Sequence, residues 1–107
     1  MEPSFRIVSD SCAGHDYFAF HGNIDARAET CLKELPRKVR HPVVKFDFSK
    51  TGRINSMGIA LLLRCLKTIR EEKSADIRLL ELNPTTTMLF KMTGIFLLAH
   101  AEKHTVQ

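Results

Sequence analysis

VVKFDFSKTGRINSMGI, residues 43–59, is the stretch that decides the fold of this chain. In its first half, Val44, Phe46 and Phe48 point to one side and alternate with a mixed set on the other, as in a strand that buries one face. From about Met57 onward, apolar residues recur every three or four positions, which is the spacing of one helix face. This stripe consists of Ile59, Leu62, Leu63, Leu66 and Ile69. The stretch therefore predicts a central strand, a turn and an amphipathic helix.

A hairpin and a helix are predicted before this stretch. Residues 5–8 and 17–20 are short runs of β-branched and aromatic residues separated by turn formers, which is typical of two antiparallel strands. A helix is expected from about residue 26 to 39, with Asp25 as its N-cap and Pro36 weakening its last turn. Its apolar face consists of Ala28, Leu32 and Leu35.

Further elements are predicted after the stretch. Residues 77–82 form the pattern of a strand, a short helix opens with Asn-Pro and spans about residues 83–92, and Gly94 ends it as a C-cap. Residues 96–99 are a candidate for a last edge strand. The polar tail, about residues 102–107, is expected to be frayed.

The order of these elements predicts the fold class. Strand-helix-strand units require right-handed crossovers and mostly parallel pairing, with helices covering the sheet. We therefore predict an α/β fold, in which a mixed, mostly parallel sheet of four to five strands is covered by three to four α-helices. A chain of 107 residues has room for one domain, so we expect a single domain over 1–107 with a folded core from about 5 to 99.

Composition narrows the functional classes. The formal net charge is +4, but the basic residues are interspersed with acids and form no stripe with stacking aromatics. We therefore expect no direct nucleic-acid partner. The apolar run at 59–63 is too short to span a bilayer, and residues 1–6 lack the features of a signal peptide. The expected location is cytoplasmic, without membrane insertion.

Cysteines and histidines do not form the pattern of a metal site. His100 and His104 alone have an i, i+4 spacing, and they fall at or near the expected frayed tail with no further ligand nearby. No nucleophile elbow and no Gly-rich phosphate loop occurs either. We therefore expect that the chain is not an enzyme and that it binds no cofactor and no metal. The three cysteines are odd in number and widely spaced, which suits reduced packing residues: Cys12, Cys31 and Cys65.

Ser56 falls at the start of the predicted long helix. It lies at or next to the N-cap, where its hydroxyl can accept a hydrogen bond from the backbone amides of the first turn. On the residues alone, Asn55 or Ser56 is a capping residue and needs no further role.

Several motifs nevertheless resemble those of STAS domains (sulfate transporter and anti-sigma factor antagonist). NSMG at 55–58 is similar to the family's Asp-Ser-Ser-Gly or Asp-Ser-Thr-Gly, which follows an apolar strand and precedes a Leu-rich helix. GNID at 22–25 resembles its Gly-Glu-Leu-Asp, and residues 83–95 resemble its final helix, from Ser-Pro to Leu-Thr-Gly-Leu. The matches occur in the right order over about residues 5–99, which is more specific than any one tetrapeptide.

By this resemblance, Ser56 matches the family's phosphorylated serine, and Asn23 and Asp25 match a loop that lies beside it. Two positions depart from the pattern. Asn55 replaces the usual Asp and removes a charge next to the acceptor, and Met57 replaces a second Ser or Thr that would be an alternative acceptor.

The resemblance implies a regulatory switch of the anti-sigma-factor-antagonist kind. Such a protein binds an anti-sigma factor, often itself a serine kinase, in its unphosphorylated form. Phosphorylation at Ser56 would release this partner, and a serine phosphatase acting on Ser56 would restore binding. The alternative is a STAS subunit that docks on the ATPase of a bacterial lipid-transport ABC system. The serine at position 56, together with Gly58 leaving the helix start accessible, favours the switch.

A partner surface follows from this resemblance. In it, Met57 and Leu61 are exposed apolar contacts, and Gly58 keeps the start of the helix clear for the partner. The competing interpretation places Met57 and Leu61 in the core and assigns Gly58 to close packing of the helix on the sheet. The expected partner-binding residues are Asn23, Asp25, Asn55, Ser56, Met57, Gly58 and Leu61.

Overall fold

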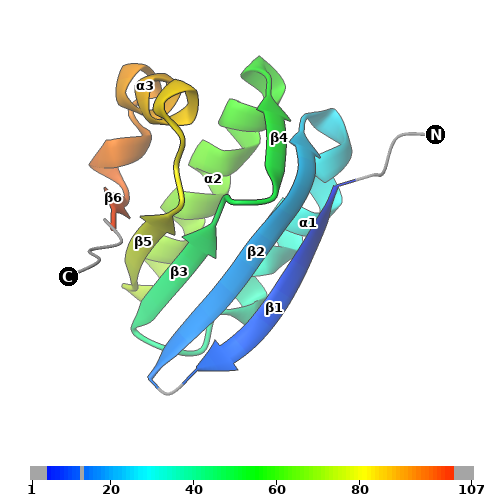
Figure 1. The fold of residues 1–107 in the computed structure, drawn as a ribbon. Helices are drawn as coiled ribbons and strands as arrows, with labels where there is room; N and C mark the ends of the chain where they lie inside the picture. The colour runs from blue at the N-terminus through cyan, green and yellow to red at the C-terminus, as the bar shows by residue number, and fades with distance from the viewer. Residues whose placement is uncertain (1–4, 13, 103–107) are drawn as a thin grey trace.

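The chain begins with a long hairpin that starts the sheet (Figure 1). The computed structural model describes residues 5–12 and 14–102. Within them, β1 (Arg6–Cys12) and β2 (His15–Ile24) pair antiparallel, from Arg6 opposite His21 to Cys12 opposite His15. The predicted hairpin is confirmed, and both strands are longer than the β-branched runs alone indicated.

The other strands extend the sheet from β2, each by parallel pairing with its neighbour. The first half of β2 pairs with β3 (Val43–Asp47), which pairs with β5 (Asp76–Leu80), which pairs with β6 (His100–Ala101). The second half of β2 pairs with β4 (Thr51–Ile54). The order is β1-β2-β3-β5-β6 with β4 beside β2, a mixed six-stranded sheet that confirms the predicted fold class.

The first helical segment is short because its sequence interrupts it twice. It begins with a 3-10 turn, η1 (Ala26–Ala28), capped by Asp25 as predicted. The α-helix α1 covers only Glu29–Glu34, and a second 3-10 turn, η2 (Leu35–Lys38), follows with Pro36 near its start. Proline has no N–H for an α-helical bond, so the last turn is not merely weakened but changes type.

The other two helices follow their capping residues. The long helix α2 spans Ser56–Lys73, and α3 spans Pro84–Thr93 with Asn83 as its N-cap and Gly94, at φ +86°, as its C-cap. Residues 96–99 are not the predicted edge strand. They belong to a 3-10 turn, η3 (Ile95–Leu97), and its exit, and the edge strand β6 follows them.

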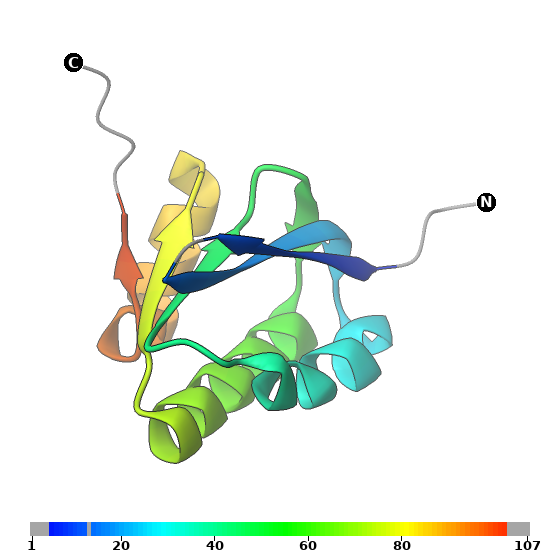
Figure 2. The ribbon, with the colours of Figure 1, turned by 90° about the horizontal axis from the view of Figure 1, so that it is seen from below.

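The helices cover only one face of the sheet. Figure 2 shows α1 and α2 together on one side, whereas the opposite side is open and α3 lies at one end of the molecule. The core is formed by the covered face of the strands with these helices, and Phe20, Phe46 and Phe90 are fully buried in it. The ring of Phe48 joins the sheet to α3, because its centroid is 5.1 Å from that of Phe20 and 5.4 Å from that of Phe90.

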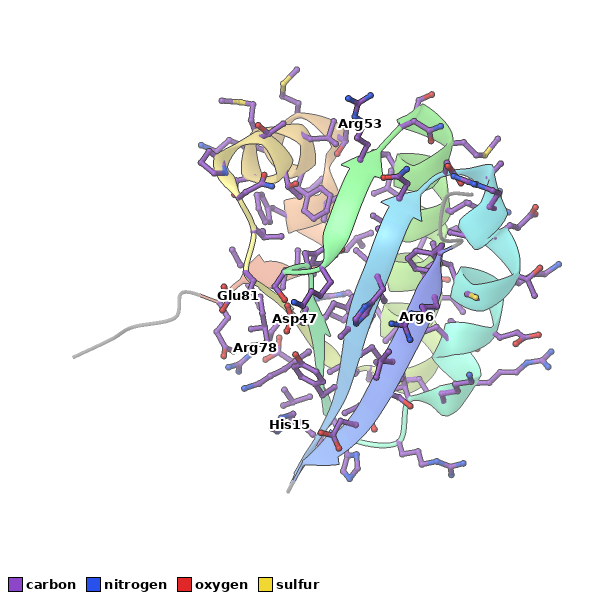
Figure 3. The ribbon with its side chains drawn as sticks, turned by 45° about the vertical axis from the view of Figure 1, so that its right-hand side comes forward. Arg6, His15, Asp47, Arg53, Arg78 and Glu81 are labelled. Carbon is purple, nitrogen blue, oxygen red and sulfur yellow. The ribbon has the colours of Figure 1, made fainter. Side chains whose placement is uncertain are left out.

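The open face of the sheet carries paired polar groups (Figure 3). The Tyr17 hydroxyl donates to Asp47, and this hydrogen bond raises the pKa of Tyr17 to about 12. The ion pairs on and beside this face are Arg78–Asp76 at 2.8 Å, Arg78–Glu102 and Lys45–Glu102 at 3.3 Å, and His100–Asp76 at 3.1 Å. Glu102 also donates its amide to Leu79, so the prediction that the tail is frayed from Glu102 is wrong for this residue. The rest of that tail lies outside the described residues.

Candidate functional site: the Ser56 turn

The cap of α2 is Asn55. Its side-chain oxygen accepts from the amide of Gly58 at 2.8 Å, and its carbonyl accepts the first helical bond, from Ile59, at 3.0 Å. An Asn cap satisfies one of the four amides that a helix start leaves without a partner. Ser56 is therefore the first residue of the helix and not its cap.

The Ser56 side chain is free and exposed. Within the described part of the chain its hydroxyl makes no hydrogen bond, since the capping bond is made by Asn55. Met57 follows it and is 50% exposed, as expected for a surface contact. The start of α2 thus presents a hydroxyl and an apolar side chain, neither of which is needed to hold the helix.

The end of β2 lies beside this turn, as predicted. The side-chain oxygen of Asn23 accepts from the amide of Arg53 at 2.8 Å, and the carbonyl of Ile24 accepts from the amide of Asn55 at 3.2 Å. The side chain of Asn23 replaces a backbone partner where the β2–β4 register shifts between Gly22 and Ile24. Two segments that lie 30 residues apart in the sequence are thereby joined beside Ser56.

Asp25 has a structural partner already. Its carboxylate accepts from the amide of Arg27 at 3.0 Å and from the Arg27 guanidinium at 2.9 and 3.2 Å. The guanidinium and the amide of Arg27 hold the pKa of Asp25 below its usual value. Asp25 lies in the predicted loop, but much of its negative charge is neutralised there.

Leu61 is not on the surface. It is only 7% exposed and belongs to the core, where it lines a narrow groove between α1 and α2 together with Leu32 and Pro36. The predicted contact between Leu61 and a partner is therefore wrong in this structure. Its neighbour on the same helix, Cys65, is also buried, and burial raises the pKa of the Cys65 thiol to about 12, so this thiol is protonated at neutral pH. The predicted packing role of Cys65 is confirmed, whereas the side chain of Cys12 lies outside the description.

Gly58 is buried, and its role is close packing. A Cβ at this position would lie 2.7 Å from the carbonyl carbon of Ile24, closer still to its oxygen, and 3.1 Å from its Cγ2. The helix therefore approaches the backbone of β2 as only a glycine allows. The expectation that Gly58 serves to leave room for a partner is wrong, and the competing interpretation is correct.

Other polar clusters serve the fold. Asp16 is buried, and its carboxylate accepts from the amides of Arg40 and His41 at 2.7 and 2.9 Å and pairs with the His41 ring at 3.0 Å. These bonds hold the turn before β3 against β2. Among the described residues, no group of three His, Cys, Asp or Glu is placed to bind a metal ion. His100 pairs with Asp76, and His104 lies outside the described residues. No helix in this part of the chain is both long enough and apolar enough to cross a bilayer.

Solved structures share this fold over almost the whole chain. An anti-sigma factor antagonist from Mycobacterium paratuberculosis superposes with a TM-score of 0.75 at 16% identity, over 94% of this chain and 88% of the other. An anti-sigma-factor antagonist (STAS) domain protein from Planctomyces limnophilus gives 0.70 at 18% identity, over 91% and 90%. This chain has the STAS fold. No protein-family model matches the sequence, and no curated protein matches it significantly.

Structures of SpoIIAA in unphosphorylated and phosphorylated forms also share the fold. The anti-sigma factor antagonist SpoIIAA in its unphosphorylated form superposes with a TM-score of 0.70 at 15% identity, over 92% of this chain and 90% of the other. SpoIIAA of Bacillus in the phosphorylated form gives 0.60 at 13% identity, over 92% and 93%. At these identities the comparisons establish the fold of this chain.

Of the seven predicted site residues, all but the buried Gly58 and Leu61 remain candidates at the turn, and the structure adds one more. Arg53 is exposed at the tip of β4, next to the Ser56 turn, and Asn23 fixes its backbone (Figure 3). Sequence reasoning missed Arg53 because β4 was interpreted as a turn. The available signal was a basic residue three positions before the serine. The five residues at the turn are Asn23, Asp25, Asn55, Ser56 and Met57.

Proposed function

We propose that this chain is a switch of the anti-sigma-factor-antagonist type. In its unphosphorylated form it binds an anti-sigma factor or a related serine kinase through the Ser56 turn, and phosphorylation of Ser56 releases it. A serine phosphatase returns it to the binding form. One observation carries the proposal: the Ser56 hydroxyl is exposed and makes no hydrogen bond to residues 5–12 or 14–102, because the adjacent Asn55 caps the helix in its place.

A phosphate on Ser56 is compatible with the folded chain. It adds about −1.5 to −2 charges at neutral pH. The first turn of α2 contains no acidic residue, and a helix N-terminus favours an exposed anion by about 0.3 to 1 kcal/mol. Since the hydroxyl makes no bond that the fold requires, modification removes no interaction. We expect the phosphorylated domain to be as stable as the unmodified one.

The same phosphate is not compatible with a complex that buries the turn. Burial would strip water from a doubly charged group, and each loss of about 1.4 kcal/mol lowers affinity tenfold. The uncharged Ser56 and the apolar Met57 beside it can be desolvated at low cost. Phosphorylation of Ser56 therefore lowers the affinity for the partner and leaves the stability of the fold unchanged.

The experiment compares phosphorylation and binding in the cells from which the chain comes. Tagged wild-type chain is recovered, its phosphorylated residues are mapped by mass spectrometry, and co-purifying proteins are quantified for wild type, Ser56→Ala and Ser56→Asp. We expect phosphate at Ser56, retention of the partner by Ser56→Ala and at least tenfold less partner with Ser56→Asp. Ser9→Asp is the matched control, because it places the same charge on another exposed serine, in β1.

Two results would contradict the proposal. Phosphate found only at other positions would show that Ser56 is not the acceptor. Equal recovery of the partner by Ser56→Asp and Ser56→Ala would indicate a static contact at the turn, as expected for a subunit of a lipid-transport ATPase.

A further inference from the structure

Several large apolar side chains are exposed on α3 and on the turn that follows it. Within the described residues, the large hydrophobic side chains that are exposed are Val8, Met57, Met88, Met92 and Leu97. Three of these belong to α3 and η3: Met88 is 55% exposed, Met92 75% and Leu97 85%. We call Met88, Met92 and Leu97 the methionine face. Apolar surface concentrated in this way on a small protein marks a binding surface more often than chance exposure does.

The methionine face is the outer side of a helix that is already fixed to the core. Met88 and Met92 are four residues apart and so lie on one side of α3, one turn from each other. The inner side is held by Phe90, which is fully buried against Phe48. Leu97 lies past the end of the helix, where its Cδ1 is 3.7 Å from the position of a Cβ on Gly94. The exposed side chains are therefore not needed to anchor α3.

The segments 48–70 and 83–101, which include β4, α2 up to Arg70, α3 and η3, carry only basic charges apart from histidine. Neither residues 48–70 nor residues 83–101 contain an Asp or Glu. Lys91 lies beside the two methionines on α3, and Arg53 projects from the tip of β4 at the same end of the molecule (Figure 3). Both side chains are exposed, and neither forms an ion pair within the described part of the chain. The methionine face thus has a basic border.

From these observations we infer that the methionine face binds an acidic amphipathic helix of the same partner that engages the Ser56 turn. This inference rests on the proposed function and specifies the chemistry of the partner. The backbone of α3 is bonded within the helix, so it offers side chains and no free strand edge; a partner helix is the element that packs against such a face. Methionine side chains adapt to varied apolar partners. Acidic residues beside the apolar ones would meet Lys91 and Arg53.

One partner can cover both sites. The helix α3, the strand β4 and the first turn of α2 lie at the same end of the molecule (Figures 1 and 3). A stable interface covers about 800 Å² on each protein, which is wide enough to reach from one of these elements to the others. An acidic partner also gives the phosphate a second effect. Added to Ser56, it repels the acidic surface as well as resisting desolvation.

Photo-crosslinking locates the partner segment. A photoreactive phenylalanine is placed at position 57, 92 or 67 of the full chain in its own cells, and the crosslinked peptides are sequenced. Lys67 is the matched control, because it is exposed on α2 away from its first turn. We expect positions 57 and 92 to crosslink to one protein, and position 92 to a helix of that protein with acidic residues flanking an apolar stripe. No crosslink from position 92, or a crosslink to a neutral or basic segment, would overturn the inference.

Substitutions then measure the contributions. Met88→Gln with Met92→Gln keeps the length of the side chains and removes their apolar surface. Arg53→Glu with Lys91→Glu reverses the charge of the basic border. Calorimetry with the crosslinked segment as a synthetic peptide should show at least tenfold weaker binding for either pair. Added salt should weaken the binding of wild type and of the methionine pair, which both keep the basic border, and should not weaken the binding of the charge-reversed pair. Thr85→Ser, at an exposed position of α3, is the control and should bind as wild type does. Unchanged affinity in both double variants would refute the methionine face as a docking surface.

Two further measurements separate the competing occupants and the two proposals. Sedimentation with vesicles of 30% phosphatidylglycerol in phosphatidylcholine tests a membrane surface, and light scattering of the free chain tests a second copy. Binding to the vesicles, or a dimer lost in the Met88/Met92 variant, would replace the inferred partner. If Ser56→Asp leaves binding intact while the methionine variants lose it, the switch fails and the docking surface stands. If instead Ser56→Asp loses binding while the methionine variants bind as wild type does, the switch stands and the docking surface fails.

Discussion

The close approach of α2 to β2 predicts the effect of Gly58→Ala. An alanine Cβ would lie 2.7 Å from the carbonyl carbon of Ile24, whereas real Cβ contacts are at least 3.0 Å. The helix must retreat by at least 0.3 Å for this atom and by more for the carbonyl oxygen. That oxygen also accepts the amide of Asn55 at 3.2 Å, so the displacement strains the bond that joins the turn to β2.

The expected magnitude follows from three contributions. Overpacking against backbone costs about 1 to 3 kcal/mol. Losing the Asn55–Ile24 bond costs about 1 kcal/mol, and alanine in place of glycine in a helix regains about 1 kcal/mol. The free energy of unfolding should therefore fall by about 1 to 3 kcal/mol, and the melting temperature by about 4 to 8 °C for each kcal/mol.

Urea denaturation followed by circular dichroism measures this effect. Ala60→Gly is the control, since Ala60 is exposed on the same helix and reports the propensity difference alone, about 1 kcal/mol. A Gly58→Ala protein that is as stable as wild type, or more stable, would refute the close-packing argument. The glycine would then have to be explained by clearance for a partner.

Three further perturbations test the caps, the core and a buried carboxylate. Asn55→Ala removes the α2 cap and should lower stability by about 1 kcal/mol in urea denaturation, while Asn55→Asp should retain it. Leu61→Ala should lower the free energy of unfolding by about 2 to 5 kcal/mol, because the side chain is in the core. A loss below about 1 kcal/mol would indicate that Leu61 is a surface residue. Burial raises the pKa of Asp16, but hydrogen bonds from the His41 ring and two backbone amides outweigh it and lower the pKa below 3.8. The charged form is thus the stabilising one, so this stability is present above about pH 4 and is lost as the pH falls below it. When the free energy of unfolding is measured as a function of pH, Asp16→Asn should be less stable than wild type at pH 7. The difference in stability between the two proteins should shrink in acid.

Local chemistry was sufficient to predict much of the fold. The alternation that ends at Phe48, the apolar stripe of α2 and the capping by Asn83 and Gly94 all depend on residues close in sequence. Each was found where it was expected. The order of strands and helices then left few topologies, because crossovers between parallel strands have one hand.

β4 could not be predicted in this way. Its four residues, Thr51–Ile54, include a glycine and follow a turn, so nothing local indicates a strand. They are extended because the end of β2 offers them an edge, and the side chain of Asn23 completes the pairing where the register shifts. A strand of this kind is decided by its neighbour.

The site was predicted where it depends on exposure of one turn and missed where it depends on packing between elements. Ser56 and Met57 are exposed because they lie at the first turn of α2. Leu61 is buried because α1 packs against the flank of α2, and Gly58 is buried because β2 passes directly beneath it. Neither contact is encoded in the periodicity of α2 itself.

The uncovered face of the sheet limits how two molecules can meet. A bare sheet face is a natural surface for stacking, yet here Tyr17 is bonded to Asp47 across β2 and β3, and Arg78 is paired with Asp76 along β5. A second molecule that stacked on this face would have to bury those pairs without replacing their contact with water, at a cost that its apolar atoms cannot offset. Stacking of a second molecule on this face is therefore unfavourable. By this comparison the end that bears Ser56, with the exposed and apolar Met57, is a less costly surface for another protein to cover than the open face of the sheet.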